Sequence, residues 1–576
     1  MNFKRRPQYH FGIDPDEVLL DATNISHLNT QQLEGRIEQP VSRTTFIVLS
    51  TVSIVLALVC VVRVAHLQII NGDELYAQSV TNKLDHTTIF AERGSIADRN
   101  GELIAWNTAY TTVSTSTIAA STTSRTRSGD FPLREYTDRP GFAHVVGYVN
   151  YPQKDAAGFY YQEEYRGVGG VEEAYHDVLH GENGAHLIEE TATGEAVTQS
   201  IIRPPVAGTD ITLTIDAGVQ EALHTAIANL ANERGFSGGA GALMDVDTGA
   251  ILALTNYPEF DPQIMTDGED TEAIEQFLND DANYFLNRMV SGMYAPGSIM
   301  KPYVALGALA LGVVDAGKQF LSTGELVVPN RYNPDQPTIF KDWKAHGWVD
   351  ARRALAVSSN VYFYIVGGGF GDQQGIGIAN IEKFVRLFGF GDTTGIDIGS
   401  ENVGTIPNPE WKAEYFPDDP WRVGDTYNTA IGQYGFQVTP LQVLRGIAAV
   451  ANDGVLVTPH VVSDAPQSRV QSRVRVDTDV LQIVREGMRQ SVNDGGTSQA
   501  LSVPYVSVAA KTGTAQIGFT KTRVNSSVTG FFPYDDPQYA FVIMMENGPV
   551  ENLYGAVGAM RATLDWMHIN TPQYFE

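Results

Sequence analysis

The chain has 576 residues, of which 43% are hydrophobic, and its formal net charge is −28 at pH 7. This length suggests more than two domains' worth of sequence, and the apolar content is enough to bury a large core, which excludes global disorder. So acidic a chain repels phosphate at long range, which argues against general nucleic-acid binding.

Cys60 is the single cysteine, and the twelve histidines show no spacing typical of a metal-binding helix. These counts exclude an intramolecular disulfide and a cysteine-based zinc site. We therefore expect no metal ion and no other cofactor.

Residues 44–62 form a run of 19 residues without a charge, bounded by Arg43 and Arg63. About 20 apolar residues span the hydrocarbon core of a bilayer as a helix. Because no small-residue cleavage site follows the run, residues 44–63 are predicted to be an uncleaved transmembrane anchor.

Two other interpretations of this run are weaker. A buried core helix is disfavoured because the run is apolar on all sides and precedes the globular part of the chain. Lipidation at Cys60 is disfavoured because Val59 occupies the position at which lipoprotein signals have a small residue. Basic residues are concentrated before the run, and after Arg63 the next one is Lys83. This bias predicts a cytoplasmic tail at 1–43 and places the long C-terminal part outside the cytoplasmic membrane.

The segment after the anchor contains short β-like stretches. Residues 92–106 alternate in hydrophobicity around Asp-Arg-Asn-Gly at 98–101, which predicts a hairpin because Asn-Gly can adopt positive φ. Residues 115–140 are rich in Ser and Thr and are predicted to form a loop or short linker. Residues 167–181 begin with glycines and continue as an amphipathic helix.

From Asp210 onward the predicted elements are longer. Residues 211–216 read as a strand, 217–235 as a helix and 240–258 as a hairpin that turns at 247–249. Near the C-terminus, 506–516, 526–533 and 539–547 look like successive strands, and a helix covers about 552–568. This order predicts an α+β domain with an antiparallel sheet flanked by helices.

Three motifs that carry chemistry follow in order along the chain. They are S-x-x-K at Ser298 to Lys301, S-x-N at Ser358 to Asn360, and K-T-G-T at Lys511 to Thr514. Each motif is weak or moderate evidence by itself, since such short patterns occur by chance on surfaces and in turns. All three in this order indicate a serine acyltransferase that recognises penicillin.

The residue types fit this chemistry. A serine hydroxyl needs a neighbouring base, and if a helix begins at Ser298, Lys301 lies one turn further on and can reach its oxygen. Lysine can act as a base only when burial or a second cation lowers its pKa, and Lys511 is the expected second cation.

The remaining motif residues are expected to hold the substrate. Ser358 could relay a proton to the leaving amine, while Asn360 could hold Lys301 and a substrate amide. On an edge strand, Gly513 would allow the substrate backbone to approach closely. The hydroxyls of Thr512 and Thr514 could bind a terminal carboxylate, and the backbone N–H groups of Ser298 and Thr514 would form an oxyanion hole.

The chain resembles the class B penicillin-binding proteins along nearly all of residues 44–568. The N-terminal motifs are RGSIADRNG at 93–101 and GVE at 170–172, followed by Tyr175. The C-terminal motifs are NR at 287–288, PGSIMK at 296–301, IGQ at 431–433 and TPLQ at 439–442. In two places the chain departs from the family pattern, because Tyr434 and Ala510 replace glycines. These departures affect the expected turn geometry and leave the catalytic residue types intact.

The resemblance implies a β-rich, elongated pedestal (dimerisation-type) domain at 64–207 and a transpeptidase domain at 208–576 with the penicillin-binding and serine β-lactamase-like fold. The implied activity is peptidoglycan D,D-transpeptidation, in which Ser298 attacks the D-Ala-D-Ala end of a stem peptide and an amine of a neighbouring stem releases it. β-Lactams would acylate Ser298. The implied membrane partner is a polytopic glycosyltransferase of the shape-elongation-division-sporulation type.

Residues 388–411 and 421–433 are more similar to the elongation branch of the family than to the division branch. Two other functions stay open. One is a D,D-carboxypeptidase or β-lactamase-like hydrolase of the same fold, which the anchor and the pedestal disfavour. The other is a catalytically silent scaffold or activator of the glycosyltransferase, which the presence of all five catalytic residue types disfavours.

Overall fold

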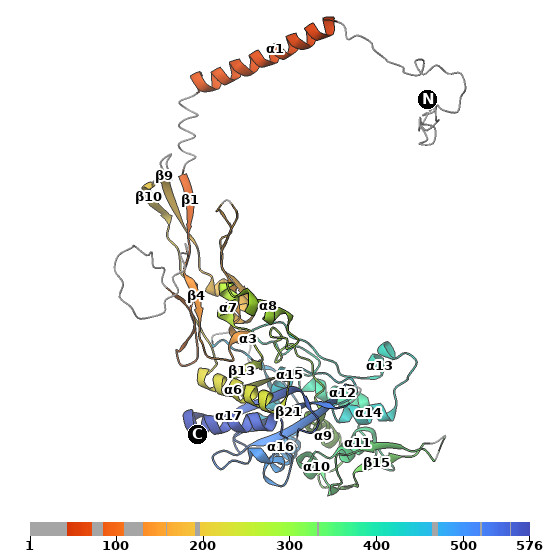
Figure 1. Cartoon of the computed structure of the whole chain (residues 1–576). Helices are drawn as coiled ribbons and strands as arrows, with labels where there is room; N and C mark the ends of the chain where they lie inside the picture. The colour runs from red at the N-terminus through yellow and green to blue at the C-terminus, as the bar shows by residue number, and fades with distance from the viewer. Residues whose placement is uncertain are drawn as a thin grey trace, which may run out of the picture. The chain divides into compact units, whose positions relative to one another are not determined.

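The computed structural model describes residues 43–71, 84–108, 131–156, 158–190, 196–330, 333, 335–463, 470–518, 521–552 and 554–575 (Figure 1). The chain divides into two compact units. One comprises Met1–Asp85 with Glu189–Val197, and the other comprises His86–Ile188 with Thr198–Glu576. The predicted tail at 1–43 lies outside the described residues except for Arg43, and so does the part of the predicted loop that precedes Phe131.

The apolar run of the first unit forms helix α1, Arg43–Ala65, which continues into a π-helical turn, η4, His66–Ile70. Phe46–Ile70 has a mean hydropathy of 2.6 and none of it is buried inside the protein. At 1.5 Å per residue, α1 is about 35 Å long, which is sufficient to cross a hydrocarbon core of about 30 Å. In the part of the chain that the structure describes, no second helix is long and apolar enough to do so.

The first part of the second unit is built from short strands and short helices. A four-stranded sheet has the order β11-β2-β3-β4, and a three-stranded sheet has the order β1-β9-β10. The bounds of the strands are β1 Leu84–Ile89, β2 Ile96–Ala97, β3 Leu103–Thr108, β4 Leu133–Tyr136, β5 Tyr148–Asn150, β6 Gln153–Lys154, β7 Tyr160–Gln162, β8 Arg166–Val168, β9 Gly184–Glu190, β10 Ala196–Arg203 and β11 Ile211–Thr212. The helices are α3 Ala143–Val146, α4 Gly170–Ala174 and α5 His176–Leu179.

The predicted hairpin at 92–106 is confirmed as β2 and β3, with Gly101 at φ +87° in the turn. The predicted helix at 167–181 is present as two short helices, α4 and α5. The predicted loop at 115–140 was wrong at its C-terminal end, because β4 pairs with β3 there. Arg134 and Tyr136 are buried on alternate positions of β4, a period of two that the neighbouring Ser and Thr residues obscured.

A buried cluster of charges forms the polar centre of this part. Glu172 accepts hydrogen bonds from Arg93 Nε at 2.5 Å and from Arg134 Nε at 2.8 Å, and all three side chains are fully buried. Buried charges are tolerated when they are paired in this way. The cluster explains why the RGSIADRNG and GVE motifs lie together, since each contributes one of its members.

The second part is organised around a five-stranded antiparallel sheet with the order β13-β12-β22-β21-β20. The strands are β12 Gly238–Asp245, β13 Ile251–Tyr257, β20 Ala509–Ile517, β21 Arg523–Phe532 and β22 Tyr539–Pro549. They confirm the predicted hairpin at 240–258 and the three predicted C-terminal strands. The predicted strand at 211–216 is shorter than expected, because only β11 pairs, and it does so with β2.

Alternate residues of the sheet enter two separate cores. Ala242 and Val542 pack with α15 on one face, whereas Leu243 and Ile543 pack with α6 and α17 on the other (Figure 1). Helix α6, Ala217–Arg234, matches the prediction closely because Asp216 caps its N-terminus and Gly235 ends it in the left-handed conformation. The C-terminal helix α17, Ala556–Asn570, confirms the helix predicted at about 552–568.

The remaining elements lie between β13 and β20 along the chain. The helices are α7 Pro262–Asp267, α8 Thr271–Asn279, α9 Lys301–Ala310, α10 Ala351–Val357, α11 Asn360–Gly368, α12 Gly377–Leu387, α13 Pro409–Tyr415, α14 Val423–Ala430, α15 Pro440–Ala451 and α16 Thr478–Asn493. The strands are β14 Phe320–Ser322, β15 Glu325–Val328, β16 Thr338–Lys341, β17 Gly347–Val349, β18 Val455–Val457 and β19 Val470–Arg473, and the 3₁₀ turns are η5 Gly297–Met300, η6 Gln499–Leu501 and, after α17, η7 Pro572–Tyr574.

The two parts of this unit are joined by polar contacts. Asp98 Oδ2 accepts a hydrogen bond from the backbone N–H of Ala217 at 3.1 Å, at the start of α6. Glu259, directly after β13, accepts hydrogen bonds from the backbone N–H groups of Gly141 and Ala143 at 2.5 and 3.1 Å. Because these contacts satisfy backbone donors, they tie the β-rich part to the sheet domain.

Candidate active site

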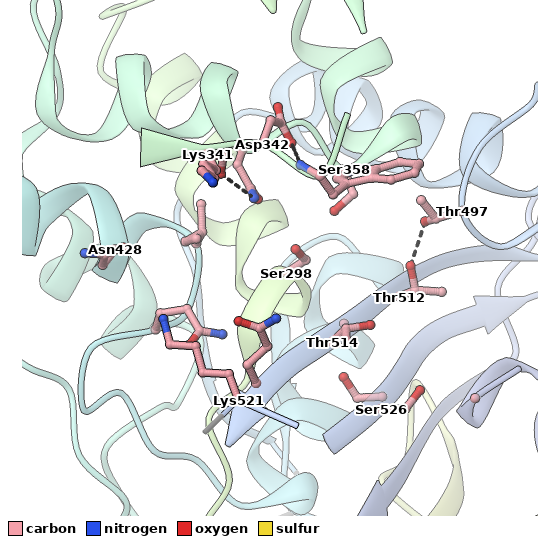
Figure 2. A pocket seen from close by; sticks show the side chains of 18 of the residues that line it. Ser298, Lys341, Asp342, Ser358, Asn428, Thr497, Thr512, Thr514, Lys521 and Ser526 are labelled. Carbon is pink, nitrogen blue, oxygen red and sulfur yellow. Dashed lines mark hydrogen bonds between the residues drawn. The ribbon is translucent and has the colours of Figure 1, made fainter. Parts of the chain in front are cut away.

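A cleft of about 880 Å³ brings the three motifs together. Ser298, Ser358, Asn360, Thr512, Gly513 and Thr514 line it, and Lys301 and Lys511 are fully buried beneath its surface. Figure 2 shows Ser298 between the Ser358 segment and the strand that carries Thr512 and Thr514. Every predicted site residue is therefore part of one constellation, although the motifs come from three distant segments of the chain.

Ser298 lies on a 3₁₀ turn and not on an α-helix, which corrects the expectation that a helix begins at this residue. The turn, η5, precedes α9, whose first residue is Lys301. Residues three apart stack on one side of a 3₁₀ turn, so Ser298 and Lys301 still lie on the same side. Gly297 enters the turn with φ +57°, and its N–H donates to Gly432 O at 2.9 Å.

Lys301 is held by three hydrogen bonds. Its Nζ donates to Ser358 O at 2.8 Å, to Ser358 Oγ at 3.2 Å and to Asn360 Oδ1 at 2.7 Å. In the described part of the chain, no hydrogen bond joins it to Ser298 Oγ. Burial lowers the pKa of Lys301 to about 7, against the opposing effect of the Asp342 carboxylate. A lysine with this pKa is present in both charge states at neutral pH, as a general base requires.

Lys511 approaches the same serine from the sheet. Its Nζ donates to Ser358 Oγ at 2.8 Å and to Thr512 O at 2.9 Å. Burial, and then the proximity of Lys301, lower the pKa of Lys511 well below its usual value. Lys511 lies on an edge strand as predicted, since β20 is the last strand of the sheet.

The Ser358 backbone is in the left-handed conformation, with φ +58°, between α10 and α11. Asp342 holds this segment, because its Oδ2 accepts hydrogen bonds from Ser359 Oγ at 2.8 Å and from the N–H of Val361 at 3.1 Å. The sequence interpretation missed Asp342, since no short spacing links it to the motif. His346 Nε2 lies 3.6 Å from Asp342 Oδ1, so this histidine packs beside the cleft.

The β20 residues face the cleft in different ways. Thr512 Oγ1 donates to Thr497 Oγ1 at 2.6 Å, while the Thr514 side chain is exposed. A Cβ at Gly513 would lie 2.3 Å from Ser527 Oγ and 2.9 Å from Pro296 O. The glycine is thus required by the packing of the Ser298 turn against β20, a reason that the sequence alone did not reveal.

The cleft is also lined by residues outside the three catalytic motifs, of which Gln433 belongs to the IGQ motif at 431–433. They are Lys341, Asp342, Trp343, Tyr364, Asn428, Gln433, Tyr434, Thr497, Gln516, Lys521, Ser526 and Ser527. Most lie on loops or on β21, so their common location depends on the fold. Within the described ranges, no group of three or more His, Cys, Asp or Glu side chains is placed to hold a metal ion.

The comparisons with known proteins follow the same division of the chain. Residues 239–563 match the penicillin binding protein transpeptidase domain, and residues 126–213 match the penicillin-binding protein dimerisation domain. The peptidoglycan D,D-transpeptidase MrdA of Escherichia coli strain K12 is 31% identical over 471 residues, which cover 76% of this chain and 71% of that protein. MrdA of Acinetobacter baumannii is 32% identical over 446 residues, which cover 72% and 63%.

Solved structures with the same fold include PBP2 of Pseudomonas aeruginosa, with a TM-score of 0.67 and 28% identity over 85% of this chain and 98% of that chain. PBP2 of Helicobacter pylori, solved in complex with MreC, has a TM-score of 0.67 and 25% identity over 84% of this chain and 99% of that chain. The family matches, the similar structures and the sequence motifs all indicate the same family. The chain belongs to the class B penicillin-binding proteins and is a peptidoglycan D,D-transpeptidase of cell-wall synthesis, with relatives of the elongation type.

Proposed function

We propose that this transpeptidase works through a covalent acyl-enzyme on Ser298. The observation that carries the proposal is the shared contact of Lys301 and Lys511 with Ser358 Oγ beside the cleft that Ser298 lines. Lys301, whose pKa burial lowers to about 7, supplies a base beside the cleft, and Lys511 is a second buried amine that contacts the same Ser358 hydroxyl.

In the first half of the reaction, Ser298 Oγ attacks the carbonyl carbon of the penultimate D-Ala while neutral Lys301 accepts the hydroxyl proton. The C–N bond to the terminal D-Ala then breaks, and its amine receives a proton through Ser358. In the second half, an amine of a neighbouring stem loses a proton to the same base and attacks the ester carbonyl. The ester C–O bond then breaks, and Ser298 Oγ leaves with the proton that Lys301 returns to it.

The other site residues have positioning roles in this proposal. Asn360 holds Lys301 and a substrate amide, and Thr512 and Thr514 bind the terminal carboxylate beside Lys511. The backbone N–H groups of Ser298 and Thr514 would stabilise the oxyanion, and such donors contribute on the order of 10²–10³ in rate. Gly513 keeps the Ser298 turn close to this strand.

The membrane arrangement is part of the proposal. We infer that α1 crosses the cytoplasmic membrane once, with residues 1–43 inside, and that residues 64–207 form the pedestal domain and residues 208–576 the transpeptidase domain. The charge bias around α1 supports this orientation. A polytopic glycosyltransferase of the shape-elongation-division-sporulation type is the proposed membrane partner. One relative is known in complex with MreC, and another similar structure belongs to a peptidoglycan synthase complex, which supports assembly with other proteins.

The decisive experiment is to incubate the detergent-solubilised full chain and its Ser298→Ala variant with a fluorescent penicillin. A stable adduct on the wild-type chain that is absent from the folded variant supports the acyl-enzyme. Rapid drug turnover without a lasting adduct would instead favour a hydrolase. A folded chain that neither binds nor hydrolyses the drug would contradict the mechanism and favour the scaffold function.

A further inference from the structure

Tyr434 has an unusual backbone conformation at a position that lines the catalytic cleft. Its φ is +67°, in the left-handed region, where a side chain costs free energy that glycine avoids. The family pattern that this loop resembles has a glycine here. The chain therefore keeps an aromatic side chain in a conformation suited to glycine, next to the reacting groups.

The loop that carries Tyr434 is fixed to the nucleophile's turn. Gly432 O accepts a hydrogen bond from the N–H of Gly297 at 2.9 Å, and Gly297 directly precedes Ser298. A Cβ at Gly432 would lie only 2.2 Å from Gly297 O, so the two backbones are in direct contact. This contact therefore gives the backbone of the Tyr434 loop a defined position relative to Ser298.

The ring of Tyr434 is held by a second group of residues. It makes edge-to-face contacts with Trp421 and Trp411, with ring centroids 5.7 and 6.1 Å apart. Lys412 Nζ lies 5.4 Å from the centroid of the Tyr434 ring. Lys412 itself is fixed by Asp425 at 2.7 Å and by Asp419 at 2.9 Å. The aromatic pairs, together with the side-chain hydrogen bonds of the Tyr434 phenol with Lys412 and Asp425, favour a single ring orientation.

We propose that Tyr434 is a specificity-determining residue, whose ring bounds one wall of the cleft and limits the size of the acyl group that Ser298 accepts. The proposal rests on the acyl-enzyme function proposed above. Backbone strain that persists at a functional site points to a role there, because a residue used only for packing has no reason to keep a costly conformation. Burial raises the pKa of the Tyr434 phenol, so it remains protonated and forms a wall, not a base.

The test compares acylation of the full chain in detergent by two penicillins that share a nucleus. One carries a small benzyl side group, and the other a bulky ortho-disubstituted aryl group. The second-order acylation constants are measured for the wild type and for Tyr434→Gly, Tyr434→Asn and Tyr434→Phe. Asparagine tolerates the left-handed conformation, so it removes the ring with little added strain if the glycine variant folds poorly.

The measured quantity is the acylation constant for the bulky penicillin divided by that for the small one. We expect this ratio to rise at least about fivefold in Tyr434→Gly and Tyr434→Asn and to stay unchanged in Tyr434→Phe. Tyr415→Ala is the matched control, because Tyr415 contacts Trp411 in the same aromatic cluster but does not line the cleft. An unchanged ratio in both ring-removing variants, with normal wild-type acylation, would overturn this inference alone. Absence of wild-type acylation would overturn it together with the proposed mechanism.

Discussion

Lys301 and Lys511 donate hydrogen bonds to the same atom, Ser358 Oγ, at 3.2 and 2.8 Å. The two lysines come from α9 and β20, and both are fully buried. One hydroxyl oxygen thus connects the expected base to the second cation. This arrangement makes Ser358 a natural path for a proton between the base and a leaving amine.

Replacement of this hydroxyl should therefore impair acylation strongly. We expect Ser358→Ala to reduce the second-order rate of acylation by penicillin by about 10²-fold or more, the usual contribution of a positioned proton-transfer group. Ser322→Ala is the matched control, because Ser322 Oγ donates to Asp342 at 3.2 Å without a hydrogen bond to either lysine. Acylation of the control should stay within about threefold of the wild type. A similar loss of acylation rate in both variants would show that the effect comes from disturbance of the segment around Ser358 and not from removal of the shared hydroxyl.

The lowered pKa of Lys301 predicts the pH dependence of acylation. Burial shifts this pKa downward from 10.5 to about 7, so the neutral amine, which is the base, accumulates as the pH rises through 7. The acylation rate should increase about tenfold per pH unit well below pH 7 and level off above it. Stopped-flow acylation between pH 5 and 9 measures this profile. A rate that is flat over the whole range would exclude Lys301 as the base.

Asp342 should set the midpoint of that profile. Its negative charge raises the pKa of Lys301, so Asp342→Asn should move the midpoint to lower pH. The plateau rate should also fall, because the Ser359 and Val361 donors lose a charged acceptor. Lys511, His346, Lys344 and Tyr364 are titratable groups near this pair and are unchanged in the variant.

Asp350→Asn is the control for this substitution. Asp350 caps α10, the helix that ends directly before Ser358, and asparagine caps helices about as well as aspartate does. This variant should keep the wild-type midpoint. Equal shifts in both variants would show that a general change of charge, and not the Asp342 contact, moves the profile.

The buried ion cluster of the β-rich part should be critical for stability. Glu172→Gln removes the only carboxylate that Arg93 and Arg134 are seen to bind in the described residues, and leaving buried charges unpaired costs about 3–5 kcal/mol. The midpoint of thermal unfolding should fall clearly. Glu382→Gln, which removes a partly exposed pair with Arg386, should change it little, since ion pairs near the surface contribute about 0–1 kcal/mol. Comparable effects of the two substitutions would contradict this assignment.

Glu259 offers a test of the joint between the two parts of the second unit. Glu259→Ala leaves the N–H groups of Gly141 and Ala143 without their carboxylate acceptor, at about 1–3 kcal/mol for each buried donor. Hydrogen exchange at residues 141–143 should accelerate. Glu221→Ala removes a half-exposed pair with Arg139 and is the matched control. Unchanged protection at 141–143 would mean that other contacts hold the joint.

The sequence by itself predicted a long apolar helix, the antiparallel sheet and the motif residues that the structure brings to one cleft. These features depend on local patterns: an unbroken apolar run, period-two strands, a capped helix at Ala217–Arg234 and short motifs whose residue types have a chemical reason. The local backbone at Ser298 was harder to predict, because a 3₁₀ turn and an α-helix place residues three apart on the same side.

The tertiary structure alone decided how the motifs meet. Asp342, Thr497 and Tyr434 have no fixed spacing from Ser298, Ser358 or Lys511, and they reach the cleft because separate loops are folded against one sheet. The pKa values of the two lysines depend on burial, which a linear pattern does not contain. The need for glycine at 513 likewise arises from contact with Pro296 and Ser527, residues that only the packed fold brings within reach.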